Sequence, residues 1–279
     1  MKFAFAFLAG LFVVALPAAA QIERPRLGYV LDSRGDLRPV MGEPASAALG
    51  DPVGVVAISF ACSLKLCLAK TDAAVVAFIP DRRGRQQGVA ASPAFVTPCA
   101  TCAGPALIAL DDPASTTGVP GAWIYFQTAH QLARWHEGIL DAIDFAPGGV
   151  VLSLRATTGG FDYAVARGRV GRKAGVVWIE HYSASDGRIT VIVDSAAVLD
   201  SPGATRAVML FDGGILLAAR DHVILRRPDG REMTFPLAGP KRFQAAGNGY
   251  VEIAVPNGLW LLRTDPGREQ LVLLPGVHE

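Results

Sequence analysis

The stretch Asp32-Ser-Arg-Gly35-Asp36 separates an apolar run at 28–31 from a second run at 37–41. The same plan, an Asp followed by Gly and a charged residue between apolar runs, returns at Asp81-Arg-Arg-Gly84-Arg85, Asp186-Gly187-Arg188, Asp229-Gly230-Arg231 and Asp265-Pro-Gly267-Arg268. Asp accepts hydrogen bonds from nearby backbone amides in turns, and Gly adopts a positive φ without a steric clash. Each stretch therefore predicts the turn of a β-hairpin.

The spacing of these turns predicts a repeat. Their glycines lie 49, 103, 43 and 37 residues apart, and the long interval holds about two periods. A less regular hairpin, between the apolar runs 123–126 and 132–135, would fill that interval. A period of about 40–45 residues with one hairpin each is typical of a four-stranded propeller blade. We expect an all-β propeller of about six four-stranded blades, within a range of five to seven.

The first half of each repeat should be a strand, a turn and a second strand. Segments of this kind lie at 55–70, 94–110, 142–154, 196–211 and 243–255. The hairpin at 27–41 precedes them, and we expect it to complete a blade or close the ring, which would hide sheet edges. The segment 127–145 also fits a helical face, but the repeat favours strands there.

The N-terminus predicts export. Lys2 precedes an apolar run at 3–16, Pro17 ends the run, and Ala18, Ala19 and Ala20 supply the small residues that signal peptidase requires. We expect residues 1–20 to be a signal peptide cleaved after Ala20, and 21–279 to form a single domain. The run is too short to span a membrane, which takes about 20 apolar residues. The predicted location is periplasmic or extracellular.

The charge balance excludes some partners. The net charge of the whole chain is +1, and removal of Lys2 with the signal peptide brings it to zero. A neutral chain of mixed sign gives no electrostatic reason to bind nucleic acid or anionic lipid.

Four cysteines, Cys62, Cys67, Cys99 and Cys102, predict structural disulfides in an exported chain. Cys62 and Cys99 are 37 residues apart, and Cys67 and Cys102 are 35 apart, which would place both pairs in the same turn of consecutive blades. We favour the local pairs Cys62–Cys67 and Cys99–Cys102, with pairing across blades as the rival. A redox Cys-x-x-Cys motif and a zinc site are weaker alternatives.

The chain resembles the broad β-propeller group with WD40-like and YVTN-like repeats, through the period and turn chemistry described above. It is also similar to exported propellers of soil bacteria, through Leu27-Gly-Tyr-Val-Leu31 and Leu37-Arg-Pro-Val-Met-Gly42. A regular Trp-Asp or Tyr-Val-Thr-Asn signature is missing, so the resemblance implies a fold and assigns no functional residue.

The sequence predicts no catalytic, cofactor-binding or metal-binding residues. The five histidines do not have the spacing H-E-x-x-H, and no serine lies in G-x-S-x-G. Asp111 and Asp112 could bind calcium with carbonyls of the loop 113–121, although a solvated loop is the simpler interpretation. The four tryptophans lie in strand patterns, where packing is a simpler role than a platform for sugars.

The leading hypothesis is a non-enzymatic binding scaffold that holds an unidentified protein, small molecule or glycan on its inter-blade loops. The loops expected to share that face are 42–52, 111–121, 155–162, 195–206 and 237–241. A second hypothesis is a propeller enzyme acting on glycans, with acids converging near the centre. Its candidate acids are Asp111, Asp112, Asp141, Asp162 and Asp200. A third hypothesis is a structural component of an envelope assembly.

Overall fold

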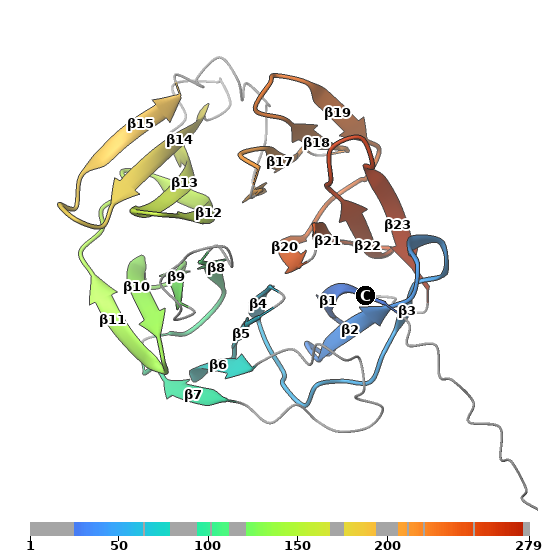
Figure 1. The fold of residues 1–279 in the computed structure, drawn as a ribbon, viewed down its shortest axis with the longest axis horizontal. Helices are drawn as coiled ribbons and strands as arrows, with labels where there is room; N and C mark the ends of the chain where they lie inside the picture. The colour runs from blue at the N-terminus through green and yellow to red at the C-terminus, as the bar shows by residue number, and fades with distance from the viewer. Residues whose placement is uncertain are drawn as a thin grey trace, which may run out of the picture.

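The strands form a closed ring of antiparallel sheets, a six-bladed β-propeller (Figure 1). The computed structural model describes residues 25–63, 65–78, 94–100, 102–111, 121–167, 176–193, 206–210, 212–219, 221–247 and 249–275. In this part of the chain the sheets are one of three strands and five of four strands, each built from consecutive strands. The expected all-β propeller is confirmed.

The blades follow one another in chain order. Blade 1 contains β1 (Arg26–Leu31), β2 (Leu37–Met41) and β3 (Ala48–Leu49), with the short 3-10 helix η1 (Pro44–Ser46) between β2 and β3. Blade 2 contains β4 (Ser59–Cys62), β5 (Cys67–Lys70), β6 (Ala74–Phe78) and β7 (Phe95–Pro98). Blade 3 contains β8 (Ala106–Leu110), β9 (Gly121–Phe126), β10 (Gln131–His136) and β11 (Ile139–Ile143).

The second half of the ring repeats this plan. Blade 4 contains β12 (Val150–Thr157), β13 (Gly160–Arg167), β14 (Val176–Ser183) and β15 (Ile189–Val193). Blade 5 contains β16 (Arg206–Met209), β17 (Ile215–Ala218), β18 (Val223–Arg226) and β19 (Glu232–Phe235). Blade 6 contains β20 (Arg242–Gly247), β21 (Tyr250–Val255), β22 (Gly258–Arg263) and β23 (Gln270–Leu274). No described helix is long and apolar enough to cross a membrane.

The core lies between blades, which explains why the strands read as continuous apolar runs. All six residues of β9 are buried. Because successive side chains of a strand point to opposite faces, Ile124 joins the apolar cluster shared with blade 2, while Trp123 and Tyr125 join the cluster shared with blade 4. Each middle strand therefore needs apolar residues on both faces.

The innermost strands β4, β8, β12, β16 and β20 pack against one another in that order, and β20 then contacts β4. Polar side chains in this ring bond to the backbone of the next inner strand. Ser59 Oγ accepts from Ala106 N (3.1 Å), and Ser153 Oγ accepts from Met209 N (2.8 Å). Gln244 Oε1 accepts from Phe60 N (2.7 Å) and completes the ring.

The N-terminal hairpin fills the gap between blades 6 and 2. It pairs with β3 to form blade 1, as expected of a segment that completes a blade. The buried carboxylate of Glu252 on β21 accepts from Leu31 N (3.0 Å) and from Arg242 Nε (2.7 Å). Arg242 Nη2 also donates to Leu31 O (2.9 Å), so β1 is fixed to blade 6 at both backbone groups of its last residue.

The predicted hairpin turns are confirmed where the structure describes them. Gly35, Gly187, Gly230 and Gly267 each have a positive φ, between 67° and 84°, and each lies between paired strands. Gly84 lies outside the described residues. The segment 127–145 forms strands, as predicted, because β10 and β11 pair from Leu132 opposite Ile143 to His136 opposite Ile139.

The predicted division into blades was wrong in three places, because 94–110, 142–154 and 196–211 do not each supply the first two strands of a blade. The described end of 196–211 holds β16, and the second strand of that blade, β17, begins later, at Ile215. The other two segments each join strands of different blades. The first holds β7, the outer strand of blade 2, and β8, the inner strand of blade 3; the second holds the end of β11 and the start of β12. The irregular hairpin at 123–135 joins the second and third strands of blade 3, whereas the hairpins at Gly187, Gly230 and Gly267 join the third and fourth strands of their blades. The predicted blade boundaries near this hairpin were therefore displaced.

Removing the hydroxyl of Ser153 should loosen the inner ring. A buried backbone N–H that loses its partner costs about 1–3 kcal/mol, so Ser153→Ala should lower the free energy of unfolding by that amount. Urea denaturation would show a lower midpoint with an unchanged slope. Ser185→Ala, at an exposed position in the turn after β14, is the matched control and should leave the midpoint unchanged. Equal midpoints for both variants would contradict the bridging role.

Lys70, the last residue of β5, is fully buried, and its Nζ donates to the carbonyl of Thr71. Burial lowers the pKa of Lys70, an effect that the nearby charge of Asp72 partly offsets. The folded chain therefore binds fewer protons than the unfolded chain between the lowered pKa and the ordinary one. Across that window the free energy of unfolding should rise with pH.

Lys70→Met should consequently stabilise the protein most at neutral pH. The advantage over the wild type should shrink as the pH approaches the ordinary lysine pKa of about 10.4, because the wild-type side chain then becomes neutral as well. Urea denaturation from pH 7 to pH 10 measures this. A constant difference across the range would contradict a lowered pKa at Lys70.

Candidate functional site

The inner strands run in the same direction and define two faces of the propeller. Ser59 and Ala106, which are hydrogen-bonded, are the first residues of β4 and β8. We call this side the strand-start face. Arg155, near the end of β12, donates from Nη1 to Leu210 O just beyond β16 (3.2 Å), on what we call the strand-end face.

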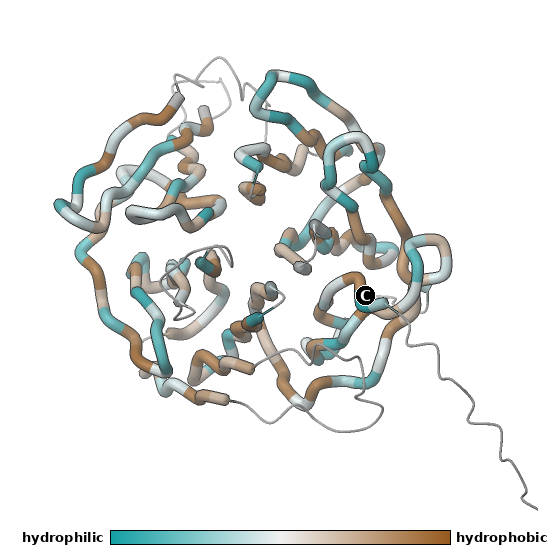
Figure 2. The backbone as a smooth tube through the Cα atoms, viewed as in Figure 1, coloured by the Kyte–Doolittle hydropathy of each residue, from teal (hydrophilic) through white to brown (hydrophobic). Residues whose placement is uncertain are grey.

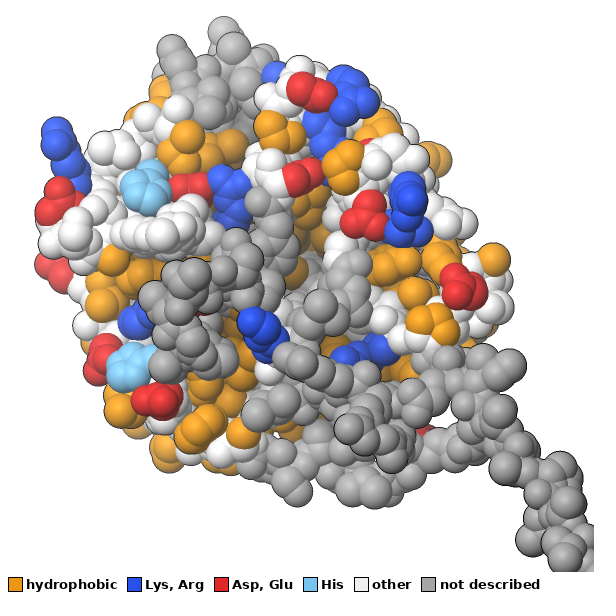
Figure 3. Space-filling view, viewed as in Figure 1, with side chains coloured by type: hydrophobic (Ala, Val, Ile, Leu, Met, Phe, Trp, Pro, Cys, Tyr) orange, Lys and Arg blue, Asp and Glu red, His pale blue; other side chains and the backbone are white. Residues whose placement is uncertain are grey.

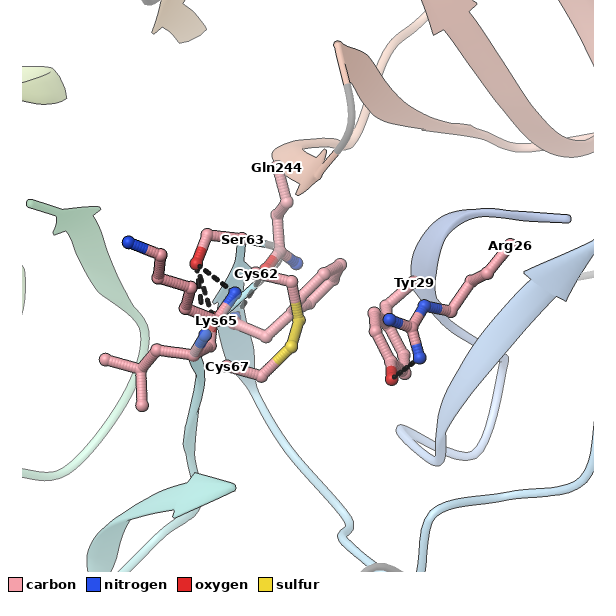
Figure 4. The surroundings of a disulfide bond; sticks show 9 residues. Arg26, Tyr29, Cys62, Ser63, Lys65, Cys67 and Gln244 are labelled. Atoms are coloured by element: carbon pink, nitrogen blue, oxygen red, sulfur yellow. Dashed lines mark hydrogen bonds between the residues drawn. A yellow bond between two sulfur atoms is a disulfide. The ribbon is translucent and has the colours of Figure 1, made fainter. Parts of the chain in front are cut away.

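A disulfide braces the turn between β4 and β5 on the strand-end face. Cys62 and Cys67 lie opposite one another in the strand register and are bonded, as predicted. Within the turn, Ser63 Oγ accepts from Lys65 N (3.2 Å) and from Leu66 N (3.1 Å). Figure 4 shows this turn beside Gln244, with Arg26 and Tyr29 of blade 1 to one side. The Arg26 guanidinium carbon lies 5.1 Å from the centroid of the Tyr29 ring.

The second disulfide lies on the opposite face. Cys99 and Cys102 are bonded, as predicted, in the connection from β7 to β8, and Cys99 N donates to Ala73 O (2.9 Å). The expectation that both pairs occupy the same turn of consecutive blades was wrong. One pair closes a turn within blade 2 and the other closes the link to blade 3, and their similar spacing reflects the long connection from β6 to β7.

On blade 3, Asp111 and Arg134 form an ion pair beside an aromatic ring. Both terminal nitrogens of Arg134, on β10, bond to the Asp111 carboxylate at the end of β8. The Arg134 guanidinium lies 4.8 Å from the centroid of the Trp123 ring. A two-point ion pair stacked on an indole is held in one orientation.

Blade 4 carries a buried acid between two bases. Asp162, at the start of β13, is only 4% exposed. Its carboxylate accepts from Arg155 Nη2 and, at 2.8 Å, bonds to Nδ1 of His181 on β14. Figure 3 shows a histidine beside acidic and basic side chains over this blade. The hydrogen bond orients the imidazole, as an acid orients histidine in many functional sites.

Arg227 ties blade 5 to blade 6. This buried guanidinium follows β18 and bonds to Asp212 (2.5 Å), to Glu269 (2.6 Å) and to the carbonyl of Thr264 (2.5 Å). Asp212 lies in the turn between β16 and β17, whereas Glu269 belongs to the turn before β23. The contact therefore stabilises the strand-end face across a blade boundary.

The candidate acids of the enzyme hypothesis are held in separate places. Asp111 pairs with Arg134 and Asp162 with Arg155 and His181, while Asp141 bonds to His136 (2.7 Å) on the outer half of blade 3. Asp112 and Asp200 lie outside the described residues. In the described ranges each of these acids is paired with a base of its own blade.

The histidines and tryptophans are mostly tied to neighbours. His222 bonds to Asp221 (2.6 Å), and His130 shares a hydrogen bond with the Tyr125 hydroxyl (3.2 Å). Trp135 is buried and its Nε1 donates to Thr97 Oγ1 (3.2 Å). Trp178 and Trp260 pack against core clusters. The described part of the chain contains no group of three or more acidic, His or Cys side chains suited to a metal ion.

The expected loop face was wrong, because its segments are split between the two faces. The segments 111–121 and 155–162 follow β8 and β12, which places them on the strand-end face. The segment 237–241 precedes β20 on the strand-start face, as does Arg206, the described end of 195–206. Residues 42–47 lie on the strand-end face, where Gly42 N donates to Pro25 O (2.8 Å). The loops were predicted on the wrong faces because the face of a loop depends on which two strands it connects, and the predicted strand order within the blades was wrong.

The ion pairs were missed from the sequence, although one carried a signal. A hairpin centred on the Gly159-Gly160 stretch places Arg155 opposite Asp162, as the strand register shows. Oppositely charged residues at such cross-strand positions attract one another. The contacts of Arg227 and Glu252 reach other blades and had no local signal.

No family model matches the sequence, and no curated protein matches it. Several solved structures are similar in shape. An extracellular domain from B. thetaiotaomicron (BT4673) is 11% identical, with a TM-score of 0.43, and the match covers 88% of this chain and 36% of that one.

PorZ, a surface component of the type-IX secretion system of Porphyromonas gingivalis, is 14% identical, with a TM-score of 0.44 over 92% of this chain and 39% of its own. BBS1N, crystallised with ARL6DN, is 11% identical, with a TM-score of 0.43 over 91% and 82%. The chain thus spans about a third of the bacterial domain named first. The assignment of the fold rests on the strand pairing described above.

Proposed function

We propose that this chain is an exported propeller that binds another protein and catalyses no reaction. The observation that supports this most is the position of the exposed apolar side chains. Apart from Val56 and Val150, the large exposed apolar residues of the described chain lie on the outer strands β7, β11, β15 and β23, at Phe95, Val96, Ile139, Ile189, Val191, Ile192 and Leu273. Figure 2 shows hydrophobic positions along these outer strands.

Exposed apolar residues lie on the outer strands on both sides of the boundary between blades 2 and 3. Val96 and Ile139 are 57% and 52% exposed, and Phe95 is 43% exposed. The strands that carry them are joined where Thr97 Oγ1 donates to Gly138 O (2.9 Å). Phe95 also meets the buried Trp135 edge to face, at 6.1 Å between ring centroids. We call Phe95, Val96 and Ile139 the rim patch.

A solvent-facing rim patch is unfavourable in an isolated protein. Exposed apolar clusters and unpaired edge strands are the features through which chains associate. Because Trp135 holds the Phe95 ring and the Thr97 bond joins β7 to the turn before β11, a partner would bind there with little loss of conformational freedom.

Two further observations support export and a binding role. Both disulfides are of a kind that persists in oxidising compartments, and the apolar run at 3–16 has the pattern of a signal peptide. The alternative, an enzyme acting on glycans, has less support because Asp111, Asp141 and Asp162 are each paired with a base. A role in an envelope assembly would use the same rim patch.

Charging the rim patch should weaken partner binding. The double variant Val96→Lys, Ile139→Lys should retain about a tenth or less of the proteins cross-linked to the wild type, because about 1.4 kcal/mol of lost contact energy is tenfold in affinity. Quantitative mass spectrometry of cross-linked material from exporting cells measures this. Val150→Lys, at an equally exposed position on inner strand β12, is the matched control. Identical cross-linked sets for all three proteins would contradict the proposal.

Export makes a separate prediction about the mature protein. Its intact mass should correspond to residues 21–279 minus two hydrogens for each of two disulfides, and should rise by those hydrogens after reduction. Protein recovered from outside the cytoplasm is the sample to measure. An uncleaved N-terminus, or thiols that react with iodoacetamide before reduction, would refute the proposed compartment.

A further inference from the structure

Arginines of the described strands are usually neutralised by a carboxylate. Those that lie within ion-pair distance of Asp or Glu are Arg38, Arg134, Arg155, Arg167, Arg226, Arg227, Arg242 and Arg263. They include the buried Arg227 and also Arg155 and Arg242, which each bond to a neighbouring blade. Against this pattern, a half-buried arginine without an acid is unusual.

Arg206 is such a residue. It is the first residue of β16 and is half-buried on the strand-start face. Its Nη1 donates to Pro240 O (3.1 Å), in the connection that leads into β20. No described Asp or Glu lies within ion-pair distance of it. A guanidinium has five N–H donors in a rigid plane, so the single carbonyl leaves most of its bonding capacity unused.

The surroundings of Arg206 are basic. Lys241 and Arg242 follow Pro240 directly, and β16 packs against β20. Arg206 and Arg242 are the first residues of the adjacent inner strands β16 and β20. Burial lowers the pKa of Arg206, and the charge of Arg242 lowers it further. Glu252 is the acid here, but its two oxygens already accept from Arg242 Nε and from Leu31 N.

A half-buried cation beside a second cation is costly unless an anion joins them. We propose that Arg206, with Arg242 beside it, binds an oxyanion, the phosphate or carboxylate group of a ligand, at the strand-start end of the inner ring. The planar fork of Arg206 suits either group, because both present oxygens that can accept two parallel hydrogen bonds. This site lies on inner strands, apart from the rim patch, and does not depend on protein binding there.

Thermal unfolding with simple anions tests the site. At constant ionic strength, replacing chloride with millimolar phosphate or acetate should raise the wild-type Tm by about 2–4 °C. A rise with phosphate alone indicates a phosphate ligand, and a rise with acetate alone indicates a carboxylate. Isothermal titration of the wild type with the same anions gives the binding constant directly.

Variants assign the effect to Arg206. Arg206→Met removes the charge but keeps the apolar stem, and it should abolish the anion-dependent rise in Tm. Arg206→Lys keeps the charge without the fork and should retain a smaller rise. Arg231→Met, at an exposed arginine paired with Asp229 in the turn before β19, is the matched control and should respond like the wild type.

Two results would overturn the site. One is a wild type whose Tm and titration heat do not distinguish phosphate or acetate from chloride. The other is an Arg206→Met variant that shows the full wild-type rise. Identical cross-linked sets for the wild type and the rim-patch variant, with the expected anion response intact, would refute the proposed function and leave the anion site standing.

Discussion

The inner ring depends on hydrogen bonds between strands that belong to different sheets. Where two blades meet, backbone amides of one inner strand cannot pair with the next as they would within a sheet, and an unpaired buried amide is costly. Ser59, Ser153 and Gln244 meet this constraint at three boundaries, each with a side-chain oxygen. The last of these bonds joins blade 6 to blade 2 and so completes the ring of inner strands.

Closure of the ring also determines which strands keep an exposed surface. Middle strands such as β9 are buried on both faces, and the last residue of β1, Leu31, is bonded to blade 6 through both of its backbone groups. The outer strands remain, each with one free edge in the described sheets. Their exposed apolar residues cannot contribute to the core of this chain. These residues, including the rim patch, are the surface through which we propose that a partner protein binds.

Most charged side chains of the described strands are neutralised by an oppositely charged neighbour. Acid and base meet in pairs on the strand-end face: the buried Asp162 bonds to an arginine and a histidine, and the buried Arg227 bonds to two acids. Such pairs orient side chains more than they add stability, because desolvation offsets most of the attraction. Among the described residues, Arg206 on the strand-start face has a carbonyl partner but no acid within ion-pair distance. A carbonyl carries no full negative charge to compensate the guanidinium, which is the basis of the anion site that we propose.

The sequence by itself determined the features that rest on contacts between near neighbours. The hairpins and the repeat were predicted from the Asp–Gly turns and the apolar runs between them, and both disulfides from cysteines five and three residues apart. These predictions succeeded because turn conformations and short loops depend on adjacent residues. Tertiary structure alone decided which strands form each blade, on which face each loop lies, which apolar residues stay exposed and that no described acid lies beside Arg206. Leu31 and Glu252 are 221 residues apart and yet bonded. Contacts at that separation exist only after the ring closes, so no local pattern could encode them.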